Sequence, residues 1–351
     1  MSARLPNVNR KVVMARRPVG LPKLDDFAIV EAPIPVPRDG EMLVRAHYLS
    51  ADPLQRYRMD AVSGYGKVLA EGDVLKGRLV GEVVQSRHPD YKVGDFVEGM
   101  LGWQEYSISD GSTKRAEYAP GIARVDPKIA PISTSLGILG FPGVTAYFAL
   151  TEICRPKAGE TVVVTGAAGA VGSLAGQIAK VMGARVVGIA GTDEKVAHIT
   201  RDLGFDAGIN YRTTPDLLAA LKAACPDKID CHYDNVGGEI ADTILQHMAW
   251  HSRIALVGNM SSNTMADRRH ATRPEYQHLL MSARVLMQGF IVYDYEDRAD
   301  EARRAIAGWL REGRIKYRET IVDGFENAPA AFISVMTGGN IGKQLVRLVR
   351  D

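Results

Sequence analysis

The sequence predicts an α/β protein of two parts, a small barrel of short strands and a parallel sheet covered by helices on both faces. The first observation is the length: 351 residues exceed the size at which one hydrophobic core keeps growing, so two domains are expected. The second is a series of short strands and turns in the first part of the chain. The third is an alternation of buried strands and helices from residue 161 onward.

The first part is marked by short apolar runs between turn-forming residues. Residues 42–44 and 79–84 are strand candidates, and the turn formers are Pro-Arg-Asp-Gly at 37–40 and Val-Gly-Asp at 93–95. Strands of this length and spacing are typical of a small barrel. The final segment, which returns to turns and short strands up to residue 351, is predicted to complete this first domain.

The second part contains four candidate buried strands, at residues 161–164, 185–189, 229–233 and 253–257. Continuous apolar strands joined by helical crossovers indicate a parallel sheet with both faces covered. The helix after the first strand carries an apolar stripe at Val171, Leu174, Ala175, Ile178, Ala179 and Met182. A second helical stretch is predicted over 299–311.

Composition excludes several classes of function. Lys plus Arg minus Asp plus Glu is 43 − 41 = +2, which does not favour nucleic acid as a partner. No apolar run is long enough to cross a membrane, and the first residues lack the apolar core of a signal peptide. Three scattered cysteines, Cys154, Cys225 and Cys231, form neither a disulfide framework nor a four-cysteine zinc site. We therefore expect a cytoplasmic protein without a metal.

A glycine-rich loop joins the first parallel strand to its helix. Ala167, Gly169 and Gly172 have the spacing of a dinucleotide fingerprint directly after the strand 161–165. Gly169 lets the backbone approach a pyrophosphate, which the amides at the positive helix end favour, and Gly172 permits close packing of helix on strand. We predict that the dinucleotide contacts Gly166, Ala167, Gly169, Ala170, Val171 and Gly172.

The end of the second parallel strand bears on which dinucleotide is bound. A binder of the unphosphorylated cofactor carries an acid there for the ribose hydroxyls, whereas this strand ends at Gly191. Lys195, in the first turn of the next helix, opposes the helix dipole and therefore favours an anion, the 2′-phosphate of NADPH. Asp193 and Glu194 leave the question open, since either could reach a ribose or simply start the helix.

Stretches spread over nearly the whole chain carry a resemblance to a known family. They are Ser50-Ala51-Asp52-Pro53 with Arg58-Met59, Gly94-Asp95-Phe96-Val97, Trp103-Gln104-Glu105-Tyr106, residues 136–147 with Phe141-Pro142-Gly143-Val144-Thr145-Ala146-Tyr147, Asp234-Asn235-Val236-Gly237-Gly238, Gly289-Phe290-Ile291-Val292-Tyr293, Gly324-Phe325-Glu326-Asn327-Ala328-Pro329 and Asn340-Ile341-Gly342-Lys343. The chain resembles the medium-chain dehydrogenase/reductase superfamily and, within it, the zinc-free prostaglandin reductases and alkenal/alkenone double-bond reductases.

The resemblance implies a fold and the absence of a catalytic metal. Residues 1–130 would form a GroES-like β-barrel catalytic domain, 131–311 a Rossmann dinucleotide-binding domain, and 312–351 a return segment that completes the barrel. Zinc-dependent relatives carry a Cys-His pair where this chain has Ser50-Ala51, and a Gly-His-Glu motif where it has Lys76-Gly77-Arg78. The resemblance therefore implies a reduction that needs no Lewis acid.

The resemblance also implies contacts with NADPH. Lys195 and Tyr211 match the positions at the 2′-phosphate, and Asn340, Phe290 and Val292 match those near the nicotinamide. Two of these residues have a plainer explanation, since Tyr211 could be half-buried packing and Asn340 could cap a turn. Asn235 and Gly258 complete the cofactor residues that we predict.

The implied reaction is reduction of the α,β-double bond of an enone or enal by hydride transfer to the β-carbon. A proton donor is then needed, for which Tyr65, Tyr293 and the ribose hydroxyl of the cofactor are the candidates. Two alternatives stay open: a quinone reductase of the same superfamily, and an NADPH-binding protein without turnover. Relatives pair through the edge strand near residues 285–287, so we expect a homodimer with a small-molecule substrate.

Overall fold

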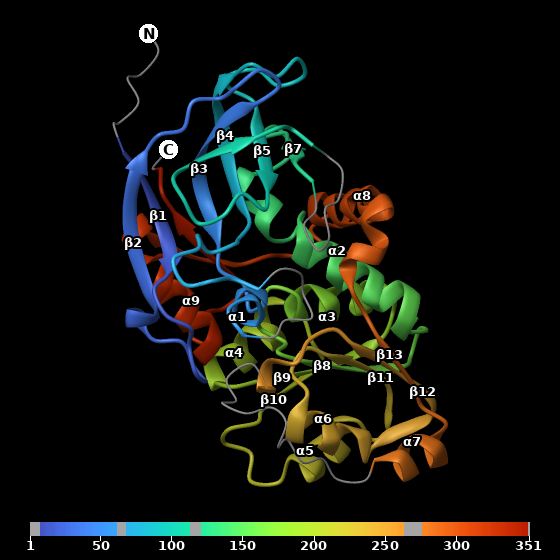
Figure 1. Cartoon of the computed structure of the whole chain (residues 1–351). Coiled ribbons are helices and arrows are strands. Elements are labelled where there is room, and N and C mark those ends of the chain that lie inside the picture. The colour runs from blue at the N-terminus through green and yellow to red at the C-terminus, as the bar shows by residue number, and fades with distance from the viewer. Residues whose placement is uncertain (1–7, 62–67, 113–120, 263–275, 350–351) are drawn as a thin grey trace. The chain divides into compact units, whose positions relative to one another are not determined.

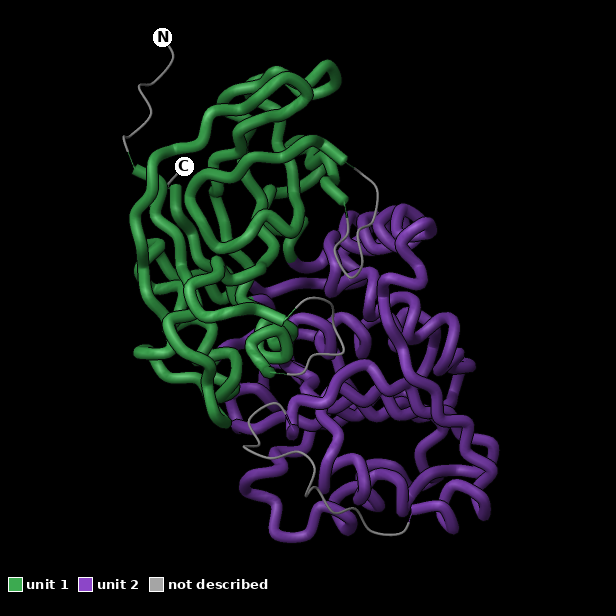
Figure 2. Tube along the Cα trace, viewed as in Figure 1, with its two compact units in different colours: residues 1–136, 320–339, 344–351 green, residues 137–319, 340–343 purple. Residues whose placement is uncertain are grey.

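The computed structural model describes residues 8–61, 68–112, 121–262 and 276–349. The chain divides into two compact units, which Figure 2 shows in different colours. Unit 1 consists of residues 1–136, 320–339 and 344–351, and unit 2 consists of residues 137–319 and 340–343. Each unit is therefore assembled from segments that lie far apart in the sequence.

Unit 1 is organised around strand β3 (Met42–Ser50), which pairs antiparallel with three other strands. These are β4 (Leu79–Ser86), β6 (Tyr106–Ser109) and β15 (Lys343–Arg347). The sheet has the order β14-β15-β3-β4-β5-β7, with β6 paired to β3, and β1 and β2 form a separate pair. The remaining strands of unit 1 are β1 (Val8–Met14), β2 (Phe27–Pro33), β5 (Phe96–Gly99), β7 (Ala123–Val125) and β14 (Glu319–Asp323).

The end of the chain belongs to the core of unit 1. Phe332 lies on helix α9 (Ala328–Thr337) and is fully buried. Its ring meets those of Trp103 and Phe27 edge-on, with 6.1 Å between the centroids in both pairs. Residues from early and late parts of the sequence thus share one core. The other helix of this unit is α1 (Leu54–Arg58).

Unit 2 contains a six-stranded sheet with the order β10-β9-β8-β11-β12-β13, in which every pairing is parallel (Figure 1). The strands are β8 (Thr161–Thr165), β9 (Arg185–Ala190), β10 (Ala207–Asn210), β11 (Ile229–Asp234), β12 (Met248–Leu256) and β13 (Leu286–Gly289). This strand order, and the helices between the strands, confirm the predicted Rossmann fold.

One predicted strand boundary was wrong. Strand β12 begins at Met248, five residues before the predicted start at Arg253. Its pairing with β11 shifts register over this stretch, and His251 has a φ of +59°. Because a bulge interrupts the apolar pattern, the sequence hides the first half of the strand.

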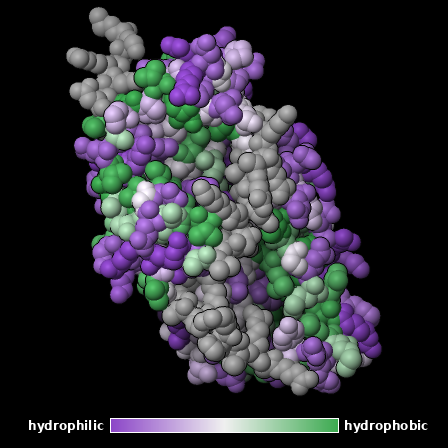
Figure 3. All heavy atoms as spheres, viewed as in Figure 1, coloured by the Kyte–Doolittle hydropathy of each residue, from purple (hydrophilic) through white to green (hydrophobic). Residues whose placement is uncertain are grey.

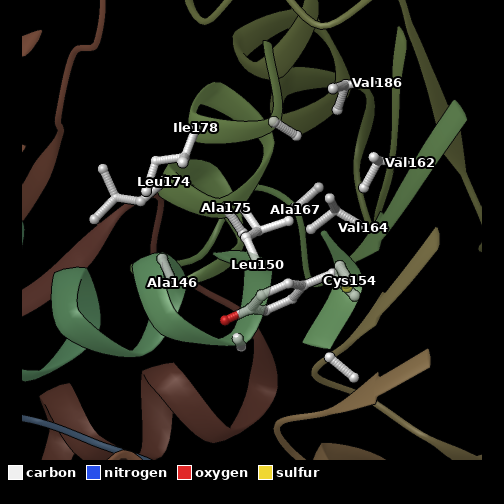
Figure 4. Close-up of a cluster of buried hydrophobic side chains, with 14 of the residues drawn as sticks. Ala146, Leu150, Cys154, Val162, Val164, Ala167, Leu174, Ala175, Ile178 and Val186 are labelled. Atoms are coloured by element: carbon white, nitrogen blue, oxygen red, sulfur yellow. The ribbon is translucent and has the colours of Figure 1, made fainter. Parts of the chain in front are cut away.

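Helices cover the parallel sheet and form a continuous core with it. In Figure 4, Ala175 of one helix lies beside Ala167, toward Val164 of the first strand, and it belongs with Leu174, Ile178 and Val162 to one buried cluster. The predicted apolar stripe therefore faces the sheet. The helices of unit 2 are α2 (Phe141–Phe148), α3 (Gly172–Val181), α4 (Asp193–Ala197), α5 (Leu217–Ala224), α6 (Gly238–Leu245), α7 (Gln277–Ala283) and α8 (Ala299–Arg311).

The surface mixes residue types. The face in Figure 3 carries hydrophilic residues interspersed with scattered hydrophobic ones. Among the described residues, no helix has both the length and the apolar character needed to cross a membrane.

Candidate cofactor site

The strand order places the candidate site at one edge of the unit 2 sheet. Successive strands run outward from β8 through β9 to β10, and the chain then returns to β11 on the other side of β8. In open α/β sheets, ligands bind beyond the carboxyl ends of the strands at such a reversal. The loops that follow these strands are therefore those that carry the predicted cofactor residues.

The glycine-rich loop has the tight geometry that a pyrophosphate requires. Gly166 has a φ of +61°, and the Gly169 amide donates to the Gly166 carbonyl at 3.0 Å. A Cβ at Gly172 would lie 2.4 Å from that same carbonyl oxygen, so this position requires glycine. Val171 begins helix α3 without a side-chain cap. The loop, Gly166 to Gly172 with Ala167 and Ala170 inside it, thus brings exposed backbone to the positive end of a helix.

The segment Asn340–Lys343 lies beside this loop. The Gly342 amide donates to the carbonyl of Ala168 at 2.7 Å, and Gly342 forms an isolated parallel bridge with Gly169. The Asn340 amide Nδ2 donates to the carbonyl of Gly342 at 2.8 Å. Asn340 therefore shapes a turn beside the glycine-rich loop, and its contact with the nicotinamide end of the cofactor stays a prediction.

A basic corner forms where strands β9 and β10 end. A Cβ at Gly191 would lie 3.2 Å from Tyr211 Cε1 and 3.3 Å from both Tyr211 Oη and Arg212 Nε. Arg212 Nε donates to the Tyr211 hydroxyl at 3.3 Å. Burial lowers the pKa of the Lys195 ammonium, and the nearby Arg212 charge lowers it further, against an opposing effect of Glu194. Tyr211 and Arg212 thus border Gly191, and Lys195 lies close enough to Arg212 for the two charges to interact, an arrangement suited to a phosphate.

Arg212 is the residue of this corner that the sequence interpretation missed. It directly follows Tyr211, outside any strand or helix, and neither periodicity nor the glycine fingerprint indicates it. The available signal was a second basic residue adjacent to a predicted phosphate contact.

The predicted start of helix α4 is confirmed. Thr192 is the N-cap, and its side chain accepts a hydrogen bond from the Lys195 amide at 3.2 Å. Asp193 is bound to Asn210, whose Nδ2 donates to Asp193 Oδ1 at 2.7 Å. The carboxylate that was a candidate for the ribose hydroxyls is thus held by a neighbouring strand.

The loop after β11 is held by side chains at the ends of β8 and β11. Asp234 Oδ1 accepts from the amides of Val236 and Gly237 at 2.9 and 2.8 Å. Asn235 donates from Nδ2 to the Thr165 carbonyl at 2.7 Å. A Cβ at Gly258 would lie 2.6 Å from the Asn235 carbonyl oxygen. Asn235 and Gly258 are therefore adjacent, beside the first strand of the site.

The predicted nicotinamide segment is rigidly packed. Phe290, Val292 and Tyr293 are all buried, and the Tyr293 ring lies 5.4 Å from that of Phe141, centroid to centroid. Tyr295 stacks between Phe290 and Phe148, at 5.3 and 4.8 Å. Tyr65, the other candidate proton donor, lies outside the described residues.

The positions that hold zinc in metal-dependent relatives carry other contacts here. The Ser50 hydroxyl donates to Asp52, and Arg78 donates from Nε and Nη2 to the two carboxylate oxygens of Glu98 at 2.6 and 2.5 Å. A guanidinium at this point is a poor neighbour for a dication. Over the described part of the chain, no cluster of three His, Cys, Asp or Glu residues could hold a metal ion.

Comparison with known proteins places this fold and site in a defined class. Residues 10–116 match the family described as the N-terminal domain of oxidoreductase, and residues 170–307 match the family described as zinc-binding dehydrogenase. The chain is 41% identical to NADPH-dependent curcumin reductase of Escherichia coli over 98% of both chains. It is 41% identical to prostaglandin reductase 1 of Bos taurus over 94% of this chain and 96% of the relative.

Solved structures agree with this placement. CurA from Vibrio vulnificus in complex with NADPH superposes with a TM-score of 0.90 at 39% identity, covering 97% of this chain and 100% of that one. The fold and site define an oxidoreductase of the medium-chain dehydrogenase/reductase superfamily. The chain belongs to the zinc-free family of prostaglandin reductases and alkenal/alkenone double-bond reductases, which confirms the predicted family and fold.

Proposed function

We propose that this protein is an NADPH-dependent reductase that saturates the α,β-double bond of enones or enals and leaves the carbonyl intact. The observation that carries the proposal is the basic corner, in which Tyr211 and Arg212 border Gly191 and Lys195 interacts with Arg212, at the same sheet edge as the glycine-rich loop. The names of relatives, NADPH-dependent curcumin reductase and prostaglandin reductase 1, support it.

Different residues of unit 2 bind different groups of the cofactor. The amides of the loop 166–172 bind the pyrophosphate, because they lie at a helix start next to glycines that admit it. Lys195, Tyr211 and Arg212 bind the 2′-phosphate. Asn235 and Gly258 border the cofactor from the β11 side, while Phe290, Val292 and Asn340 border its nicotinamide end. When bound, NADPH supplies the hydride.

The proton donor is Tyr65, Tyr293 or a cofactor hydroxyl, and substitution separates them. General acid catalysis contributes ~10²–10⁴-fold, so removing the donor hydroxyl lowers kcat by up to that factor. Tyr65→Phe and Tyr293→Phe should be compared for kcat and for NADPH affinity. Substitution of the true donor should lower kcat strongly and leave NADPH affinity unchanged. If both substitutions have only a small effect on kcat, the proton comes from a cofactor hydroxyl or from water.

The reaction is tested by its product. With NADPH and 3-nonen-2-one, we expect the saturated ketone. Formation of the allylic alcohol would overturn the reaction class. Turnover of a small quinone together with no turnover of enones or enals would favour the quinone reductase alternative, and failure to consume NADPH with any of these substrates would favour a binding protein without turnover.

We propose further that two copies pair through β13 and that the protein works in the cytoplasm. Strand β13 is the last of its sheet, and three apolar side chains on β13, β12 and α7, Leu286, Trp250 and Met281, are 55%, 71% and 72% exposed. An open edge with apolar residues favours pairing. Light scattering should give about 76 kDa, twice 38.2 kDa, and Leu286→Lys should lower it. The three cysteines are free and buried, which fits a reducing compartment.

A further inference from the structure

We propose that Asn210 is the positioning residue that sets the preference for NADPH over NADH, because it binds the Asp193 carboxylate and at the same time holds the turn that carries Arg212. The inference rests on the proposed 2′-phosphate corner. It adds a residue that is not itself expected to touch the cofactor.

The first half of the argument concerns Asp193. It lies at the first position of α4, three residues after β9 ends at Ala190, close to the strand end where an acid holds the ribose hydroxyls in binders of the unphosphorylated cofactor. A free carboxylate at this point would attract a ribose diol and repel a phosphate. Asn210 Nδ2 donates to Asp193 Oδ1 at 2.7 Å, which fixes the carboxylate against the end of β10. The carboxylate of Asp193 is therefore present, but it is hydrogen-bonded to Asn210.

The second half concerns Arg212. The side-chain oxygen of Asn210 accepts from the backbone amide of Arg212 at 3.1 Å, and its carbonyl accepts from the amides of Thr213 and Thr214 at 3.3 and 3.0 Å. These bonds close the turn after β10 so that the side chain of Arg212 reaches Tyr211 beside Gly191. The carboxamide thus binds both the acid and the Arg212 amide, while the two bonds to the backbone carbonyl remain in any substitution of Asn210.

Asparagine is suited to this position for a simple chemical reason. Its carboxamide donates at one end and accepts at the other, and both partners here are met by that one orientation: a carboxylate needs the donor, and an amide N–H needs the acceptor. Aspartate lacks the donor, and an apolar residue lacks both. Asn210 itself is only 9% exposed, and both of its side-chain bonds are part-buried, so their loss leaves a largely buried carboxamide position without partners.

The two bonds predict a shift of specificity, because releasing Asp193 favours NADH while loosening Arg212 disfavours NADPH. We expect Asn210→Ala to lower the ratio of kcat/KM for NADPH to that for NADH by about tenfold or more, the scale of one hydrogen bond to a charged group. If Asn210→Ala does not fold, Asn210→Leu removes the same bonds while filling the space. Kd values for both cofactors, from fluorescence titration, provide an independent readout.

A double-mutant cycle separates positioning from a general structural role. In the Asp193→Asn background no carboxylate remains to be released, so Asn210→Ala should change the ratio clearly less than it does in the parent protein. Asp206→Asn is the matched control, because it removes a half-buried carboxylate near the opposite end of β10, where Asp206 accepts from the Val186 amide at 2.7 Å. It should leave the ratio unchanged.

The outcomes distinguish this inference from the proposed function. An equal loss for both cofactors on Asn210→Ala, or an effect of undiminished size in the Asp193→Asn background, overturns the role of Asn210. Lys195→Ala, measured in parallel, tests the phosphate corner itself. If Lys195→Ala weakens NADPH binding selectively and Asn210→Ala has no effect on the ratio, the phosphate corner is supported and only the positioning role of Asn210 is rejected. If Lys195→Ala weakens the binding of both cofactors equally, the phosphate corner itself is rejected.

Discussion

Arg78 and Glu98 form a two-pronged ion pair inside unit 1, with Nε to Oε1 at 2.6 Å, and both side chains are at least 90% buried. Breaking a buried pair by removing one partner leaves the other charge without compensation. Arg78→Ala should therefore lower the free energy of unfolding by about 3–5 kcal/mol, measured by denaturant titration. Replacing both residues, Arg78→Met with Glu98→Leu, should cost clearly less. An equal cost would mean that packing, and not charge, is what Arg78 contributes.

The same pair leads to a prediction about metal. The resemblance matches residues 76–78, which end at Arg78, to a zinc-binding motif of metal-dependent relatives, and in this protein Arg78 is paired with Glu98. Activity with NADPH and an enone should therefore survive prolonged dialysis against a chelator. Stoichiometric zinc by elemental analysis, lost in parallel with activity, would contradict this mechanism.

The basic corner predicts cofactor discrimination. A hydrogen bond to a charged group contributes roughly 1.5–3 kcal/mol, or about 10- to 150-fold in affinity. Lys195→Ala and Arg212→Ala should each weaken NADPH binding within that range and leave NADH nearly unchanged, as measured by fluorescence titration of both cofactors. Lys180→Ala is a suitable control, since this lysine pairs with Asp206 at 2.9 Å and not with the corner.

The lowered pKa of Lys195 predicts a pH dependence of NADPH binding. Burial, and then the charge of Arg212, bring this pKa below its ordinary value of 10.5, so the ammonium loses its proton at a lower pH than a surface lysine. A bound phosphate favours the charged form. NADPH affinity should thus be full below the pKa of the free enzyme and decrease as the pH rises through it, while NADH affinity stays flat. Lys195→Arg keeps the charge and should remove this alkaline decrease. If the alkaline decrease in NADPH affinity persists in Lys195→Arg, a group other than Lys195 causes it.

Two glycines of the nucleotide loop should respond differently to alanine. A Cβ at Gly172 would lie 2.4 Å from the Gly166 carbonyl oxygen, so Gly172→Ala must distort the loop and should reduce both thermal stability and NADPH binding. At Gly169 the same oxygen is 3.2 Å away, a contact that the loop can relieve by a smaller shift, so Gly169→Ala should cost less thermal stability than Gly172→Ala and lose affinity because its methyl group obstructs the pyrophosphate. Gly308→Ala, in open space on helix α8, should leave cofactor binding unchanged. Normal NADPH affinity in Gly169→Ala would remove the pyrophosphate from this loop.

The sequence alone determined the features that depend on residues close together along the chain. Glycines between a buried strand and an amphipathic helix identify the dinucleotide loop, because the backbone conformation and close packing there depend on the missing side chains. Lys195 and the absence of an acid at Gly191 indicated the phosphorylated cofactor on the same local grounds. The family motifs added the fold of both units and the reaction class.

Tertiary structure decided which charged groups meet. Asp193 and Asn210 are 17 residues apart, and Arg78 and Glu98 are 20 apart, so each pair forms only because two strands bring their loops or side chains together. Periodicity in one strand does not specify the register or the rotamer of its neighbour. For this reason Asp193 remained an open candidate for the ribose in the sequence, whereas in the folded sheet it is a bound carboxylate beside a site for phosphate.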